Sequence, residues 1–110
     1  FESWATVKGV VKILAQAPSH PWRLSEIAAE TQLSARTLQR RLEAGGQSFS
    51  RLVRSVRVQH ACRQLQHTDM SITEAGFVSG FSDSAQFSRD FRASMGLSPT
   101  AYREAVQGLS

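Results

Sequence analysis

The chain has 110 residues, of which 41% are hydrophobic, enough for one compact domain or two small subdomains sharing a core but too few for a two-domain enzyme. It contains 13 Lys and Arg residues against 9 Asp and Glu, and this net charge of +4 favours a polyanionic partner such as nucleic acid. Eleven of the 13 basic residues are Arg, whose planar fork suits phosphate oxygens and the guanine edge. The composition therefore favours DNA.

Cysteine usage and hydropathy indicate the compartment. The single cysteine, Cys62, excludes an internal disulfide framework and fits a reducing cytoplasm. No apolar run approaches the length of a membrane span, and no leader pattern opens the chain. We expect a cytoplasmic, nucleoid-associated protein with no membrane partner.

The first helix is predicted over residues 3–16, where apolar residues recur every three or four positions. This stripe comprises Trp4, Val7, Val10, Val11 and Leu14. Pro18 and Pro21 then end the helix.

Two short helices are predicted next, over residues 24–31 and 35–44. The inner face of the first carries Leu24, Ile27 and Ala28. Ser34 is expected to cap the second helix, which buries Leu38 and Leu42 and ends at Gly45 and Gly46. Its other faces carry Arg36, Gln39, Arg40 and Arg41.

A longer amphipathic helix is predicted over residues 49–66. Its inward residues are Phe49, Leu52, Val53, Val56, Ala61 and Leu65. Four arginines lie largely outward, at Arg51, Arg54, Arg57 and Arg63. For the first three, the sequence leaves phosphate contact and bridging between subdomains equally open.

Three further helices complete the chain. The serine-to-glutamate spacing from Ser71 to Glu74 indicates a capping box, and Gly80 ends that short helix. A helix over residues 84–94 buries Phe87 and Phe91. Ser98 and Pro99 then begin the last helix, which runs through Tyr102 and Val106. For Arg103 on this helix, phosphate contact and bridging between subdomains are again equally open. Seven helices without a strand signal predict an all-α fold.

The sequence repeats internally. Five residues recur at an offset of 48, pairing Leu24, Ile27, Ala28, Leu33 and Ser34 with Ile72, Ala75, Gly76, Phe81 and Ser82. Beyond the turn, Leu38 and Leu42 match Phe87 and Phe91 at an offset of 49, so the second copy has one extra residue. Each copy has a small residue where two helices cross, a tight turn, and a second helix with a polar face. This is the layout of a helix-turn-helix.

Three segments carry a family resemblance: residues 33–42 (LSARTLQRRL), 80–91 (GFSDSAQFSRDF) and 96–103 (GLSPTAYR). Through them the chain resembles the AraC/XylS family of bacterial transcription regulators over nearly its whole length. The resemblance implies two helix-turn-helix subdomains, residues 1–48 and 67–110, joined by a long central helix, residues 49–66. It also implies that both recognition helices enter successive major grooves of double-stranded promoter DNA.

The resemblance assigns base contacts residue by residue. In the first recognition helix they correspond to Arg36, Gln39 and Arg40, and in the second to Ser84, Ala85, Gln86, Ser88 and Arg89. The alternatives are a solvated helix face in the first helix and an ion pair of Arg89 with Asp90 or Asp83. Asp83 is expected at the helix start, and the Ser34 and Ser82 hydroxyls are expected to be caps. We expect the first unit to supply most polar base recognition, and the second more positioning and shape contacts.

Several positions depart from the family pattern. Arg23 is a poor cap, and Gln32 occupies a turn position where a left-handed backbone is strained. In the second copy, mid-helix Gly76 costs about 1 kcal/mol relative to alanine. Ala75 is smaller than the isoleucine that is more usual at this position in the family, and we expect Phe77 to refill the space that Ala75 leaves.

Other functions find little support in the residues. His60, Cys62 and His67 do not gather on one helix face, and no catalytic arrangement or phosphate loop is recognisable, so we predict no metal, no cofactor and no enzyme. The main alternative is a helical interaction module that contacts RNA polymerase or a partner regulator without reading DNA; a targeting domain of a DNA-repair enzyme is a third.

The chain begins with Phe1 instead of Met, which suggests a fragment of a longer protein. Members of the family are usually activators with a separate effector-binding or dimerisation domain. We therefore expect such an N-terminal domain to be missing from this sequence.

Overall fold

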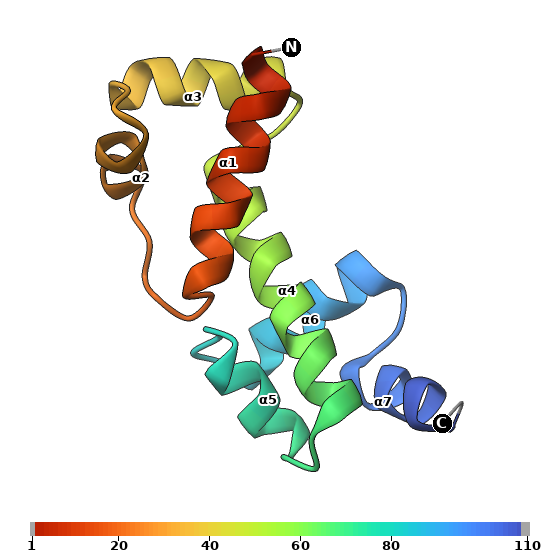
Figure 1. Ribbon diagram of the computed structural model, residues 1–110. Coiled ribbons are helices and arrows are strands. Elements are labelled where there is room, and N and C mark those ends of the chain that lie inside the picture. The colour runs from red at the N-terminus through yellow and green to blue at the C-terminus, as the bar shows by residue number, and fades with distance from the viewer. Residues whose placement is uncertain (1, 109–110) are drawn as a thin grey trace. The chain divides into compact units, whose positions relative to one another are not determined.

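The computed structural model describes residues 2–108 and has, within that range, seven helices and no strand (Figure 1). They are α1 (Glu2–Gln16), α2 (Leu24–Thr31), α3 (Ala35–Ala44), α4 (Phe49–His67), α5 (Ile72–Val78), α6 (Ser84–Met95) and α7 (Pro99–Gly108). The predicted all-α class is confirmed. Across these described residues, no helix has both the length and the apolarity to cross a membrane.

The described residues form two compact units whose boundary falls inside α4. The first unit extends to Val56, and the second begins at Arg57. Successive parts of α4 contribute to separate cores: Leu52 and Val56 to the first, and Val58, Ala61 and Leu65 to the second. Val58 was missing from the predicted inward set, because that set assumed one continuous apolar stripe along the helix.

In the first unit, α3 packs against both α1 and α2. The buried core consists of Val10, Leu14, Ile27, Ala28, Leu38, Leu42, Leu52 and Val56. Trp4, which the sequence placed in the inward stripe, is instead 64% exposed, with the Lys8 ammonium 5.0 Å from its ring centroid. An ideal helix places Trp4 about 80° from Leu14 and about 120° from Val10, which is off the buried face.

In the second unit, three phenylalanines and a tyrosine form a chain of ring contacts. The ring centroids of Phe81 and Phe87 lie 5.0 Å apart, those of Phe87 and Phe91 5.7 Å, and those of Phe91 and Tyr102 5.4 Å. Val58, Ala61, Leu65 and Ala75 complete this core. The buried faces of α6 and α7 therefore meet through aromatic side chains.

Gly76 allows α5 and α6 to approach closely. A Cβ atom at this position would lie 2.5 Å from Cδ2 of the buried Phe87 ring. The expectation that Phe77 refills the space that Ala75 leaves is wrong, since Phe77 is 68% exposed. The aromatic residue that packs against this helix, at Gly76, is Phe87. The larger aromatic residue comes from the facing helix, which the spacing along α5 could not reveal.

Candidate nucleic-acid interface

The first candidate recognition helix, α3, presents its polar face away from the core. Leu38 and Leu42 are buried, while Arg36, Gln39 and Arg40 are exposed. Within residues 2–108, neither Arg36 nor Arg40 forms an ion pair. Their guanidinium groups are therefore available to a ligand outside the protein.

The neighbouring side chains of α3 are engaged within the protein. The Gln39 side-chain amide donates to Glu43 Oε1 at 3.4 Å, which places both on the outer face. Arg41 lies 3.9 Å from the Glu2 carboxylate, so it links α3 to the start of α1. Arg41 thus differs from Arg36 and Arg40 in having an acidic partner.

The start of α3 is capped as predicted, because Ser34 Oγ accepts the Thr37 N–H at 3.1 Å. Before it, Gln32 adopts the left-handed conformation, with φ 59° and ψ 32°. Among the described residues it is the only non-glycine with a positive φ. The expected strain in the first turn is therefore present.

The start of α2 lacks a capping side chain at Arg23, as predicted, but another residue supplies part of the cap. The Glu26 carboxylate accepts the Arg23 backbone N–H at 2.9 Å and also contacts His20 at 2.9 Å. The hydrogen bond with His20, and then that with Arg23, lowers the pKa of Glu26 below its usual value. An Arg side chain has no acceptor atom, so Glu26 alone acts as the capping group.

The second candidate recognition helix, α6, begins at a cap that the sequence misplaced. Asp83 Oδ1 accepts the backbone N–H groups of Ala85 at 2.7 Å and Gln86 at 3.3 Å. Asp83 therefore stands at the helix start, as expected, but the prediction that Ser82 caps the helix is wrong. The extra residue in the second copy shifts the cap by one, so Asp83 takes the place of Ser34.

The outer face of α6 is exposed at every position that the sequence selected: Ser84, Ala85, Gln86, Ser88 and Arg89. Phe87 and Phe91 are buried on the opposite face. Arg89 forms no ion pair with any residue in the described range, and the carboxylate of Asp83 is occupied by the helix cap. The arrangement of α3 is repeated here with fewer charges.

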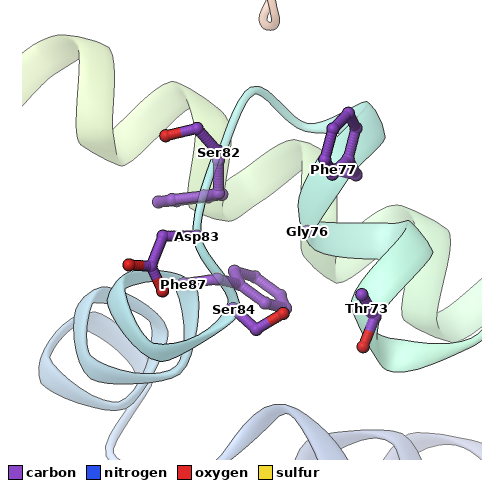
Figure 2. A pocket seen from close by; sticks show the side chains of 8 residues that line it. Thr73, Gly76, Phe77, Ser82, Asp83, Ser84 and Phe87 are labelled. Atoms are coloured by element: carbon purple, nitrogen blue, oxygen red, sulfur yellow. The ribbon is translucent and has the colours of Figure 1, made fainter.

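A small hollow lies where α5 and α6 meet (Figure 2). It has a volume of about 100 Å³, and Gly76 and Phe87 are among the residues that line it. Figure 2 shows Asp83 and Ser84 beside it at the start of α6. The hollow therefore adjoins the capped start of α6, next to the point where the Phe87 ring packs against Gly76.

Charge divides unequally between the units. Residues 1–56 contain eight Lys or Arg and four Asp or Glu, whereas residues 57–110 contain five of each. The entire surplus of +4 therefore belongs to the first unit. Attraction to a polyanion should accordingly be stronger there.

Arg103, whose role the sequence left open, caps the end of α4. Its Nε donates to the Leu65 carbonyl at 3.2 Å, and a terminal nitrogen donates to the Thr68 carbonyl at 3.3 Å. Gln107 also donates to the Leu65 carbonyl at 3.2 Å. These bonds satisfy carbonyl groups that have no partner within α4.

One polar contact that sequence reasoning missed joins His60 of α4 to Ser79, the residue after α5. His60 Nδ1 lies 2.9 Å from Ser79 Oγ. No pattern could have indicated this pair, because 19 residues separate its members. Nearby, burial raises the pKa of the Cys62 thiol, which therefore stays protonated at neutral pH. In the part of the chain that the structure describes, no three His, Cys, Asp or Glu residues are placed to hold a metal ion.

Comparisons of this chain with a protein-family model, with related proteins and with solved structures all indicate the same kind of domain. A family model described as a helix-turn-helix domain matches residues 27–105. The transcriptional activator NphR of a Rhodococcus species is 37% identical over 81 residues, which cover 74% of this chain and 24% of that protein. The chain thus spans about a quarter of that relative.

Two solved structures are similar in fold. A regulator from Chromobacterium violaceum, described as having an AraC-type DNA-binding domain, aligns with a TM-score of 0.87 at 25% identity, covering 96% of this chain and 95% of that one. The DNA-binding domain of AdpA, solved in complex with a target DNA, aligns with a TM-score of 0.80 at 28% identity, covering 94% of both chains.

Proposed function

The chain belongs to the AraC/XylS family of helix-turn-helix DNA-binding domains, and we propose that it reads a promoter sequence by placing α3 and α6 in successive major-groove segments. The observation that carries the proposal is the repeated arrangement of a capped helix, buried on one face and polar and exposed on the other. An α-helix fits the major groove of B-form DNA, where base edges are distinguishable.

In the first unit, Arg36 and Arg40 suit the O6 and N7 acceptors of guanine, and Gln39 suits adenine. Each good bidentate pair contributes about 1–3 kcal/mol of discrimination against the wrong base. The exposure of all three side chains, and the lack of ion pairs at the two arginines within residues 2–108, support this assignment.

The second unit reads DNA with smaller groups. Its face consists of Ser84, Ala85, Gln86, Ser88 and Arg89, of which Arg89 is the one charged residue. Hydroxyl and amide groups can hydrogen-bond to more than one kind of base, and the methyl group of Ala85 can make an apolar contact with the methyl group of thymine. We assign most polar base recognition to α3, and positioning and shape recognition to α6.

The whole protein acts, in this proposal, as a transcription activator in the bacterial cytoplasm, associated with the nucleoid and without enzymatic activity of its own. A separate N-terminal domain would bind the effector or mediate dimerisation. An additional contact with RNA polymerase is part of this proposal, and Phe77 and Val78 of α5, at 68% and 45% exposure, are its candidate apolar contacts.

The proposal is tested by measuring the affinity of Arg40→Ala and Arg89→Ala variants for the cognate site and for sites with single-base changes. We expect Arg40→Ala to weaken cognate binding about 10- to 100-fold and to lose discrimination at one base. Arg92→Ala serves as the matched control, since Arg92 is exposed on α6 outside the assigned set and its loss should weaken all sequences alike. Unchanged affinity and discrimination in both variants would show that these faces do not read DNA.

A further inference from the structure

The His60–Ser79 contact belongs to a short hydrogen-bond network inside the second unit. Ser79 is fully buried, and its hydroxyl donates to the Ala75 carbonyl at 2.7 Å. His60 Nδ1 lies 2.9 Å from the same hydroxyl oxygen, and the Gln64 side-chain nitrogen lies 3.3 Å from His60 Nε2. A buried polar group is costly without partners, and here each one has them.

The network fixes the protonation of the imidazole. A serine hydroxyl has one proton, and Ser79 gives it to Ala75, so Ser79 Oγ must accept from His60. Nδ1 of His60 therefore carries the hydrogen. In the neutral ring Nε2 is then an acceptor, which matches the donor that Gln64 presents.

Ser79 stands where the chain leaves α5 and turns toward α6. The Ser79 and Phe81 backbone N–H groups both donate to the Gly76 carbonyl, at 3.2 and 3.0 Å. The Phe81 ring then contacts Phe87, which lies on the buried face of α6. A side chain that fixes the position of Ser79 therefore also fixes the turn after α5. The packing of α6 depends on this turn.

We propose that His60 is a positioning residue for DNA reading by the second unit: its neutral ring holds Ser79, and with it the turn that orients α6. This inference rests on the proposed function and adds a residue that touches no DNA. It predicts that loss of the His60 bond affects the bases read by α6 and spares those read by α3.

The electrostatic surroundings favour the neutral ring. Burial, and then the positive charge of Arg63, lowers the pKa of His60 below its usual 6.5. The one charged residue of α5, Glu74, is in its first turn, at the opposite end from Ser79. A proton added at Nε2 would also face the nitrogen of Gln64, placing two donors together.

The sign of the pH effect follows from the lowered pKa. Protonation adds a hydrogen at Nε2 and leaves the Nδ1–H donor to Ser79 in place, so the contact of Nε2 with Gln64 is present above the usual histidine pKa and is lost as the pH falls through the lowered value. Loss of the Gln64 contact removes one of the two side chains that hold the ring, so base preference at the α6 block should weaken in acid, though by less than in a variant that lacks the Ser79 bond.

The test compares the parent chain with His60→Ala and His60→Asn by selection of bound sequences from random DNA. An asparagine amide can donate to Ser79 as Nδ1 does, whereas alanine cannot. We expect His60→Ala to lose the preference of one block and about tenfold in affinity. His60→Asn should retain both blocks and show no acid dependence. Circular dichroism confirms that each variant is folded.

A folded His60→Ala variant that keeps both blocks at parental affinity would overturn the proposal. If that variant does not fold, the ¹⁵N chemical shifts of the His60 ring in the parent chain test the proposal, because they report which ring nitrogen is protonated. A protonated Nδ1 and a bare Nε2 at neutral pH agree with the network, and the opposite tautomer refutes it. Failure of the parent itself to select any sequence would instead refute DNA reading, so the two proposals fail separately.

Discussion

At the scale of single residues, Gly76 shows why this chain carries a poor helix former inside a short helix. The ring of Phe87 occupies the space beside it, and a Cβ atom there would come within 2.5 Å of that ring. Glycine destabilises a helix by about 1 kcal/mol relative to alanine, but at this position it allows α5 to pack closely against α6.

Replacing Gly76 with alanine should destabilise the protein. Overpacking of a dense core costs about 1–3 kcal/mol and helix propensity returns about 1 kcal/mol, so we expect a net loss of up to about 2 kcal/mol in the free energy of unfolding. Urea denaturation measures it. Gly9→Ala in α1 is the matched control, because nothing lies within 4 Å of the new Cβ, and it should stabilise instead. Equal gains in both variants would show that Gly76 is not crowded.

At the scale of elements, the two helix-turn-helix units differ in how their turns are made. Gln32 holds the left-handed position in the first, whereas Asp83 gives the second recognition helix two hydrogen bonds to its cap. Ser34 supplies one backbone bond at the start of α3. The first unit, which carries the richer arginine face, thus has the more strained boundary.

The strain at Gln32 can be relieved. A left-handed conformation costs a non-glycine residue about 1–2 kcal/mol, and part of this returns as chain entropy, so Gln32→Gly should raise the free energy of unfolding by about 0.5–1 kcal/mol. Gln47→Gly, at a position without positive φ, should lower it by a similar amount. A loss of stability in Gln32→Gly would mean that the turn is not strained.

If Arg103 caps α4, its replacement should affect protein stability, whereas replacement of a phosphate contact should affect the salt dependence of DNA binding. Arg103→Leu removes two donors from the end of α4, and we expect the free energy of unfolding to fall by about 2 kcal/mol. The salt dependence of DNA binding should stay unchanged. Arg92→Leu, at an exposed position, should change stability by less than about 0.5 kcal/mol. A shallower salt dependence in Arg103→Leu would assign the residue to the DNA backbone.

Local signals in the sequence placed most elements. The predicted bounds of α2 and α3 agree with the structure, because a proline, a serine cap and a glycine pair mark them. The packing of Phe87 against Gly76 and the His60–Ser79 bond were not predictable, since each joins segments that only the folded chain brings together. Trp4 was misplaced because three- and four-residue spacings tolerate drift around a helix.

The candidate site was predictable where the two copies match. The positions opposite the buried Leu38, Leu42, Phe87 and Phe91 are exposed, as the repeat implied. The misplaced Ser82 cap arose at the one point where the copies differ in length. Contact of these faces with bases stays a prediction.

At the scale of the whole molecule, the uneven charge predicts how DNA binding responds to salt. Four phosphate contacts at a slope of about 0.9 each would weaken binding about a hundredfold between 50 and 200 mM salt. Replacing Arg51 with Gln should lower the slope by about 1, whereas replacing Arg63 with Gln should lower it by less than about half of that. Titrations by fluorescence anisotropy measure this, and equal effects of the two substitutions would contradict an anchoring role for the first unit.

The central claim is that both units read one DNA site, and selection of bound sequences from random double-stranded DNA tests it most directly. We predict two conserved blocks about 10 base pairs apart, centre to centre, because recognition helices in successive major grooves on one face lie one helical turn apart. The Arg40→Ala variant should lose guanine preference in one block only. Recovery of no shared sequence, or of a single block that Arg40→Ala leaves intact, would contradict the account.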